Sequence, residues 1–283
     1  MSNFNAKQYK ALIFDVYATL IDWQAGIWAR LHPMLERINS PLANSKGDAF
    51  KAFFSVQDDL WAKYPKMLYP EVLATAFATL EARLKNEPSP LHSGSATSGI
   101  VTTSGVPESS ITPAESSGRS QLVIDSYAKA FGDSIPDWPP FTDSIAALQY
   151  LSTIYKLTVL SNVDRASFAG TQKLLETSDP EHQFKFTAIY TAEEIGSYKP
   201  DPANLRYALK KLKDDYGVEK DEVLVVAASL PHDHVPANAL GLAGIFIDRE
   251  GAEMNEGIKV TYNAAFPTLG AFAGEVKKQL ESS

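Results

Sequence analysis

Residues 11–20 read Ala-Leu-Ile-Phe-Asp-Val-Tyr-Ala-Thr-Leu, and this stretch decides the fold. A short apolar run of strand-forming residues delivers one carboxylate, Asp15, into a turn that also carries the hydroxyl of Thr19. Because open α/β sheets place their chemistry at the carboxyl edge of their strands, Asp15 is a candidate nucleophile. The alternative is a core strand whose aspartate only caps the next helix. The residue two positions after the acid is Tyr17, so that position offers no second carboxylate.

The carboxyl-terminal half of the chain alternates between strand and helix patterns. Apolar runs of strand length occur at 157–161, 188–191, 223–227 and 244–247. Helical spacing of apolar residues occurs near 143–153, 164–176, 201–215, 234–241 and 267–281. Alternation of this kind predicts an α/β fold with a doubly wound parallel sheet, a Rossmann-like core.

About a hundred mostly helical residues separate the first strand from the others. Apolar residues recur at helical spacing between 27 and 84 and again near 121–131, and residues 86–120 are dense in Ser, Thr, Gly and Pro. These patterns predict a helical cap domain at 23–133 inserted into a core domain formed by 1–22 and 134–283. The polar stretch at 86–120 is expected to be a flexible insertion within the cap.

Composition limits the classes of function. The 283 residues are 45% hydrophobic and 21% charged, with a formal net charge of −8 and no cysteine. This usage is typical of a globular enzyme, and the absence of cysteine excludes disulfides, thiolate nucleophiles and cysteine-based metal sites. The negative charge disfavours nucleic-acid partners, and no apolar run approaches the roughly 18 residues that span a bilayer. We therefore expect a cytoplasmic protein without a membrane partner, and a homodimer if an apolar cap helix is exposed.

Polar residues follow the later strands as well. Ser161 and Asn162 come directly after one strand, Lys199 lies in a proline-fixed turn after the next, and His232 and Asp233 follow a third. Strand-end residues of parallel strands meet at one edge, where a lysine could neutralise carboxylates. The alternatives are ordinary turn chemistry for the serine and asparagine, a solvated lysine, and imidazoles that only line a turn. Two such residues are too few for a metal site.

In this order the motifs resemble the haloacid dehalogenase superfamily over essentially the whole chain. The matching positions are the acid after strand one, the serine after strand two, a lysine before Pro-Asp, and a final acid. The stretches Asp-Val-Tyr-Ala-Thr-Leu, Leu-Ser-Asn and Tyr-Lys-Pro-Asp look more narrowly like the type II L-2-haloacid dehalogenase branch and its fungal-type relatives. The resemblance implies a metal-independent hydrolase that acts on the carbon–halogen bond of a 2-haloacid.

The resemblance also implies roles for individual residues. Asp15 would attack the halogen-bearing carbon and form an aspartyl ester that water hydrolyses. Thr19, Ser161 and Asn162 would orient that carboxylate and bind the substrate carboxylate, and Lys199 would keep Asp15 ionised. Asp233 would hold the lysine or activate water, with His232 or His234 as a possible helper. The residues expected to bind a small carboxylic acid substrate are Tyr17, Asn162, Ser229, His232, Gln57 and Trp61.

Several positions depart from the pattern of the superfamily. Tyr17 stands where phosphatases carry a second aspartate, and Ala228-Ser229 replaces their Gly-Asp, so a phosphatase is the least favoured relative and only it would need Mg²⁺. The glycine expected after Tyr17 is alanine. Residues 53–61 lack the cap arginine that receives the halide in the dehalogenases, although Arg30 lies earlier in the cap. A hydrolase of a non-halide substrate and a non-catalytic member of the fold therefore remain as alternatives.

Overall fold

The computed structural model describes residues 4–64, 67–86, 124–177, 179–181, 183–249, 255 and 257–282. They form two compact units. The described residues of 1–29, 68–70 and 133–283 form the sheet unit, and those of 30–67 and 71–132 form the helical unit. The predicted limits of the cap, 23 and 133, stay a prediction.

The sheet unit contains six parallel strands in the order β3-β2-β1-β4-β5-β6. Their bounds are β1 Ala11–Phe14, β2 Lys156–Ser161, β3 Ala188–Thr191, β4 Val223–Ala227, β5 Ala243–Ile247 and β6 Ala264–Phe266. The predicted parallel α/β fold is therefore confirmed. The sequence did not predict β6, because a three-residue edge strand of Ala-Ala-Phe shows no recognisable period.

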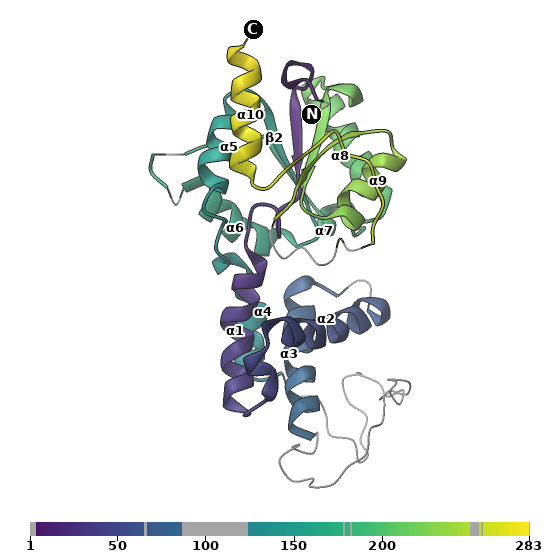
Figure 1. Ribbon diagram of the computed structural model, residues 1–283. Coiled ribbons are helices and arrows are strands. Elements are labelled where there is room, and N and C mark those ends of the chain that lie inside the picture. Colours follow the sequence, from purple (N-terminus) through teal and green to yellow (C-terminus); the bar gives the residue numbers. More distant parts are fainter. Residues whose placement is uncertain are drawn as a thin grey trace. The chain divides into compact units, whose positions relative to one another are not determined.

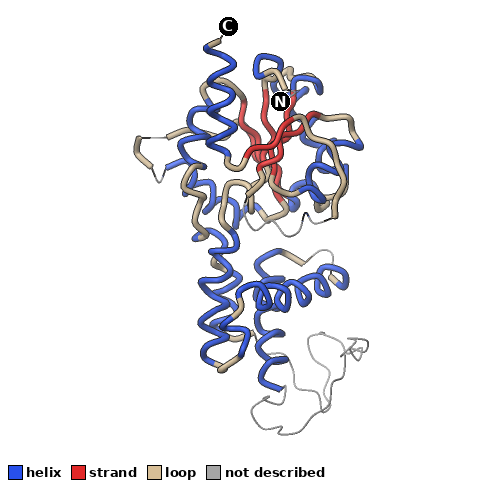
Figure 2. Tube along the Cα trace, viewed as in Figure 1, coloured by secondary structure: helices blue, strands red, loops and turns tan. Residues whose placement is uncertain are grey.

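Helices cover both faces of this sheet (Figures 1 and 2). On one face α5 packs against α10 and β2, and on the other α8 packs against α9 and β2. The bounds are α5 Ser144–Ser152, α6 Arg165–Thr177, α7 Ala192–Ile195, α8 Pro202–Tyr216, α9 Val235–Ala239 and α10 Leu269–Glu281. The helix expected at 234–241 is shorter, because residues Leu230–His234 form a π-helical turn, η6, that precedes it.

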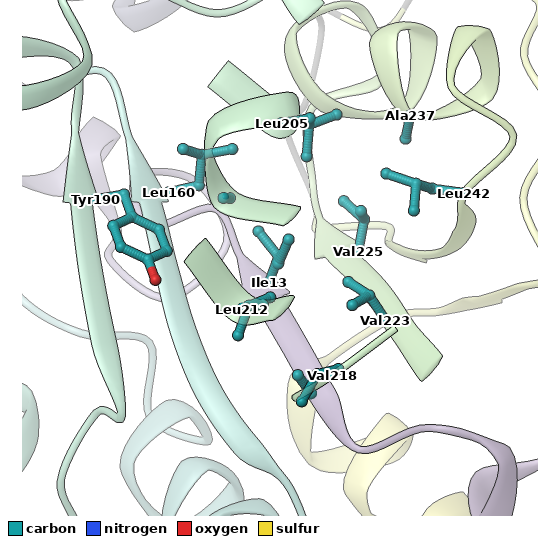
Figure 3. Packing of buried hydrophobic residues seen from close by; sticks show 12 residues of the cluster. Ile13, Leu160, Tyr190, Leu205, Leu212, Val218, Val223, Val225, Ala237 and Leu242 are labelled. Carbon is teal, nitrogen blue, oxygen red and sulfur yellow. The ribbon is translucent and has the colours of Figure 1, made fainter. Parts of the chain in front are cut away.

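Burial on both faces explains why the strands read as continuous apolar runs. Every residue of β1 is buried, and in register Ile13 lies beside Val225. These side chains pack with Leu205 and Leu212 of α8 in one cluster (Figure 3). Full burial of a side chain such as Leu212 contributes about 1.5–3 kcal/mol. The cluster therefore anchors β1, the strand that leads into Asp15.

The helical unit is built from α2 Lys46–Lys63, α3 Tyr69–Asn86 and α4 Ser126–Gly132, together with the later part of α1 Trp23–Arg37. Phe131 of α4 packs against Phe53 of α2 and Phe77 of α3, with ring centroids 5.5 and 5.1 Å apart. Apart from Asn86, the flexible insertion predicted at 86–120 lies outside the described residues. Within the described part of the chain, no helix is both long enough and apolar enough to cross a membrane.

Gly26 of α1 provides a test of the packing of the sheet unit. A Cβ at this position would lie 2.3 Å from Cγ of Trp138, which is buried. We expect Gly26→Ala to lower the free energy of unfolding by about 1–3 kcal/mol through overpacking. The matched control is Gly274→Ala in α10, where no atom lies within 4 Å of the added carbon. Gly274→Ala should raise the free energy of unfolding, measured by urea titration, by roughly 0.5–1 kcal/mol. Equal changes in the two variants would contradict this packing.

Candidate active site

The carboxyl ends of β1, β2 and β4 bring the predicted residues to one edge of the sheet. β1 lies between β2 and β4, with Phe14 level with Val159 and Val226. Asp15 directly follows β1, Ser161 ends β2, and the segment from Ser229 to Asp233 follows β4. The loop after α7 adds Lys199.

Lys199 joins two buried carboxylates. Its Nζ donates to Asp15 Oδ1 at 2.7 Å, to Asp233 Oδ1 at 2.8 Å and to the carbonyl oxygen of Leu160 at 3.1 Å. The ammonium group therefore has an acceptor for each of its three protons. Burial alone would lower the pKa of Lys199, but the two carboxylates outweigh it and raise that pKa above its ordinary value. The lysine stays charged, and its charge is shared between two acids.

Thr19 holds the second oxygen of Asp15. The Thr19 hydroxyl donates to Asp15 Oδ2 at 2.7 Å and accepts from the backbone N–H of Ala228 at 2.9 Å. Both oxygens of the carboxylate thus receive a hydrogen bond from a buried donor. The predicted role of Thr19 in orienting Asp15 agrees with this geometry.

Arg249 fixes the backbone of the same loop. Its Nε and Nη2 donate to the carbonyl oxygen of Thr19 at 3.2 and 3.0 Å, and its Nη1 donates to Asp143 Oδ1 at 2.7 Å. The guanidinium also lies 4.0 Å from the ring centroid of Phe141. Sequence reasoning missed this arginine. Arg249 could have been found in the sequence, because it comes just after the strand β5, as Asp15 comes just after β1.

Ala18 occupies the turn between Asp15 and Thr19 with a φ of +79°. This left-handed conformation costs an L-residue with a Cβ about 1–2 kcal/mol, which explains why a glycine is expected there. The turn is kept by hydrogen bonds from the N–H of Ala18 to Ile21 O and from the N–H of Thr19 to Val16 O. The alanine is thus accommodated at a cost.

Ser161 ends β2 and Asn162 follows it, and their side chains have different surroundings. Asn162 does not orient Asp15, because its Oδ1 accepts from the backbone N–H of Lys199 at 2.7 Å and its Nδ2 donates to the Lys199 carbonyl oxygen at 3.1 Å. Its amide therefore positions the lysine. The Ser161 hydroxyl is buried and has no hydrogen-bond partner among the described residues. A buried hydroxyl of this kind is available to a bound molecule.

The turn η6 presents Asp233 to the lysine. Asn255 clamps this turn, accepting from the N–H of Leu230 at 2.8 Å and donating to the Ala228 carbonyl oxygen at 2.9 Å. Asp233 Oδ2 is buried and has no partner in the described part of the chain. Burial and the charge of Asp15 raise the pKa of Asp233 to about 7, although Lys199 opposes them. One lysine does not compensate two buried carboxylates.

The two histidines of η6 have different surroundings. His232 is half-buried, with its Nδ1 3.0 Å from the Ser229 hydroxyl. Burial, together with Lys199, lowers its pKa. His234 is fully buried, and its Nε2 lies 3.1 Å from the carbonyl oxygen of Ala227. The ring of His234 is thus enclosed and bonded to the end of β4. The predicted part of either histidine in activating water stays a prediction.

Tyr17 lies close to the site, in the sheet unit. Its hydroxyl is 3.0 Å from Thr171 Oγ1, and its ring packs edge-on against Trp138. Burial raises the pKa of the phenol far above its ordinary value. Tyr17 therefore supplies no carboxylate and no readily ionised acid. Gln57 and Trp61 belong to α2 of the helical unit, and their part in the site stays a prediction.

Residues 9–233 match the family model of the haloacid dehalogenase-like hydrolases. The chain belongs to that family. No protein of curated function matches this hydrolase in sequence.

Solved structures similar to this hydrolase share its fold. The HAD-hydrolase YfnB from Bacillus subtilis, bound to magnesium, is 17% identical with a TM-score of 0.62, covering 95% of this chain and 99% of its own. The L-2-haloacid dehalogenase from Xanthobacter autotrophicus with chloropropionic acid covalently bound is 18% identical with a TM-score of 0.62, covering 95% and 98%. The defluorinating L-2-haloacid dehalogenase Rha0230 is 16% identical with a TM-score of 0.64, covering 97% and 99%. At these identities the similarity establishes the fold alone.

The magnesium in YfnB raises the question of whether this hydrolase has a suitable set of donors. Mg²⁺ is held by carboxylates and other hard oxygen ligands in octahedral geometry. Here Asp15 and Asp233 each direct one oxygen to Lys199, and the other oxygen of Asp15 accepts from Thr19. Within the described residues no group of three or more His, Cys, Asp or Glu side chains could surround a metal ion. The donor set is a poor fit for Mg²⁺.

Thr19 and Thr158 form a matched pair for testing the hydrogen bond to Asp15. Both side chains are fully buried, but only the Thr19 hydroxyl is bonded, whereas Thr158 Oγ1 has no partner among the described residues. We expect Thr19→Val to lower the free energy of unfolding by about 1–3 kcal/mol, because it leaves Asp15 Oδ2 and the Ala228 N–H unpaired. Thr158→Val should be neutral or stabilising. Equal losses in urea unfolding would show that the Thr19 bond is not formed.

The raised pKa of Asp233 predicts a pH dependence of stability. A carboxyl whose pKa moves from 3.8 to about 7 on folding binds its proton more tightly in the native state. Its contribution to stability is complete below the lower value and is lost as the pH rises through the higher one. The free energy of unfolding of wild type minus that of Asp233→Asn should therefore fall by at least about 1 kcal/mol across this window. His232 and His234 are common to both proteins. A difference that rises with pH would contradict the assignment.

Proposed function

We propose that this hydrolase cleaves the carbon–halogen bond of a 2-haloacid without a metal, with Asp15 as the nucleophile. The observation that carries the proposal is the buried Asp15 carboxylate, which is held at 2.7 Å by both Lys199 Nζ and the Thr19 hydroxyl. A carboxylate fixed on both oxygens at a strand end is oriented for attack and keeps lone pairs for it. The covalently bound chloropropionic acid in the Xanthobacter autotrophicus dehalogenase supports a covalent route in a protein of the same fold.

In the first step an oxygen of Asp15 attacks the carbon that bears the halogen. A carbon–oxygen bond forms as the carbon–halogen bond breaks, and the halide leaves with the bonding electron pair. The product is an ester between Asp15 and the 2-carboxyalkyl group. This displacement inverts the configuration at the carbon. The Lys199 ammonium then faces Asp233 and the uncharged ester group of Asp15. The carboxylate of the bound 2-carboxyalkyl group keeps its negative charge, and the halide carries the other one away.

In the second step water hydrolyses that ester at the carbonyl carbon of Asp15. The carbon–oxygen bond to the alkyl group is untouched, so the inverted configuration is kept in the 2-hydroxy acid. The carboxyl regenerated at Asp15 ionises beside Lys199 and releases a proton to solvent. Lys199, anchored by Asp233 and by the backbone contacts of Asn162, stays in place throughout.

A halide leaving group suits this site better than a phosphate ester does. An alkoxide leaving group needs a general acid, and Tyr17 stands where such an acid would be required. The set of donors is also a poor fit for the metal ion that would bind phosphate. We assign the unpartnered hydroxyl of Ser161 to the substrate carboxylate.

The second candidate function is hydrolysis of a non-halide substrate. The observation that favours it is His232, an imidazole in the same turn as Asp233, together with the absence of arginine from residues 53–61. A leaving group that must be protonated would use such an imidazole, whereas a halide would use the arginine. The two candidate functions differ in whether the enzyme releases halide from a 2-haloacid.

Chloride release from L-2-chloropropionate in the presence of EDTA tests the proposal. We expect wild type to release chloride and to form D-lactate, and Asp15→Asn to release none, because an amide oxygen is a poor nucleophile. Chiral chromatography of the product checks the inversion. A folded wild-type protein that releases no chloride would contradict the proposal and favour the second candidate. Chloride release by both proteins would exclude Asp15 as the nucleophile.

A further inference from the structure

We propose that His232 is the catalytic base that activates water for hydrolysis of the aspartyl ester, with Ser229 as the residue that positions its ring. This inference rests on the proposed function, because it concerns the second step of that reaction.

The segment that carries His232 is tied at two points to the residues that hold Asp15, Thr19 and Lys199. At its start, the N–H of Ala228 donates to the Thr19 hydroxyl that holds Asp15, at 2.9 Å. At its other end, Asp233 Oδ1 accepts from Lys199 Nζ at 2.8 Å. His232 lies between these two connections, in a π-helical turn whose shape Asn255 clamps. The imidazole is therefore carried by backbone fixed on both sides to the groups that surround Asp15.

Ser229 fixes one nitrogen of the ring and leaves the other for chemistry. Ser229 Oγ lies 3.0 Å from His232 Nδ1, and it also accepts from the backbone N–H of His232 at 3.3 Å. In the tautomer whose Nδ1–H donates to Ser229, Nε2 carries a lone pair. No described residue bonds to Nε2. A half-buried imidazole with one nitrogen held and the other available has the arrangement that a general base needs.

The charged and titratable groups near the ring keep it neutral. Lys199 disfavours a second positive charge and, together with burial, lowers the pKa of His232 below its usual value, while Asp15 opposes them. Asp233 and His234 directly follow the residue in the same turn. After the first step Asp15 is an uncharged ester group, so its own carboxylate no longer favours imidazolium, and the remaining negative charge is that of the bound 2-carboxyalkyl group. The ring is thus an acceptor when water must be activated.

The other candidate groups are less suited to the task. Asp233 uses one oxygen to hold Lys199, and burial raises its pKa to about 7, so a large fraction is protonated near neutral pH. His234 is enclosed, with its Nε2 on the carbonyl oxygen of Ala227. His234 also has a ring nitrogen without a partner among the described residues, Nδ1, but that atom is fully buried. The ring of His232 is half-buried.

The proton balance closes with His232 as the carrier. The water oxygen bonds to the carbonyl carbon of Asp15 while one water proton moves to His232 Nε2. The tetrahedral intermediate then loses the alkyl oxygen, which takes that proton back and leaves as the 2-hydroxy acid. The second water proton remains on the new carboxyl of Asp15 and is released when Asp15 ionises beside Lys199.

Rapid-quench kinetics of His232→Gln with L-2-chloropropionate test the inference. We expect a burst of about one chloride per enzyme, as in the first turnover of wild type, followed by a steady-state rate lower by roughly 10²–10⁴-fold. The peptide that contains Asp15 should then carry the added carboxyalkyl mass. Ser229→Ala should lower the steady-state rate less, because the ring keeps its nitrogen and loses only its orientation. The apparent pKa that His232 gives to the pH dependence of the steady-state rate should differ between wild type and Ser229→Ala.

Two comparisons separate this role from a structural one. His32→Gln, at a histidine of the helical unit, should leave both burst and steady state unchanged. Asp233→Asn should reduce the burst itself, because it removes a partner of Lys199. A His232→Gln enzyme that turns over at the wild-type rate, or that stalls without an ester on Asp15, would overturn the inference. A wild-type enzyme that releases no chloride would overturn the proposed function, and this inference with it.

Discussion

One buried ammonium group shared by two buried carboxylates is the interaction on which this site depends. Lys199 lies between Asp15 and Asp233, each within 2.8 Å, and its third proton goes to a strand carbonyl. Removing one partner of a buried ion pair typically costs about 3–5 kcal/mol, because it leaves a buried charge uncompensated. Because one ammonium group does not neutralise two carboxylates, the pKa of Asp233 is raised. Alkylation removes the charge of one of the two carboxylates bonded to Lys199, which links the electrostatics of the resting site to the proposed chemistry.

The parallel sheet supplies the rigidity that this arrangement requires. β1 is buried on both faces between β2 and β4, so the position of Asp15 is set by the packing of the core. Residues distant in sequence hold the loop that follows β1. Arg249 donates to the carbonyl oxygen of Thr19, and the N–H of Ala228, after β4, donates to the Thr19 hydroxyl. Side chains on a rigid frame can be placed within the tolerance that catalysis needs.

Much of this could be predicted from the sequence, and the reasons are physical. The parallel fold follows from the alternation of apolar periods. The convergence of Asp15, Lys199 and Asp233 follows from their places in the segments after β1, β3 and β4, which end at one edge of the sheet. Hydrogen bonds between distant residues leave no such signal. Asn162 bonds to the backbone of Lys199 instead of Asp15, and Arg249 reaches Thr19 across 230 positions. The π-helical turn also escaped prediction, and with it the difference between His232 and His234.

The most direct test of the central claim is a single turnover of excess enzyme in water labelled with the heavy isotope of oxygen. If Asp15 is the nucleophile, the 2-hydroxy acid takes its oxygen from the unlabelled carboxylate of the enzyme, and the label appears in the peptide that contains Asp15. Mass spectrometry of that peptide and of the product measures both. Label found in the first-turnover product and absent from Asp15 would mean that water attacks the substrate directly, and it would contradict the account.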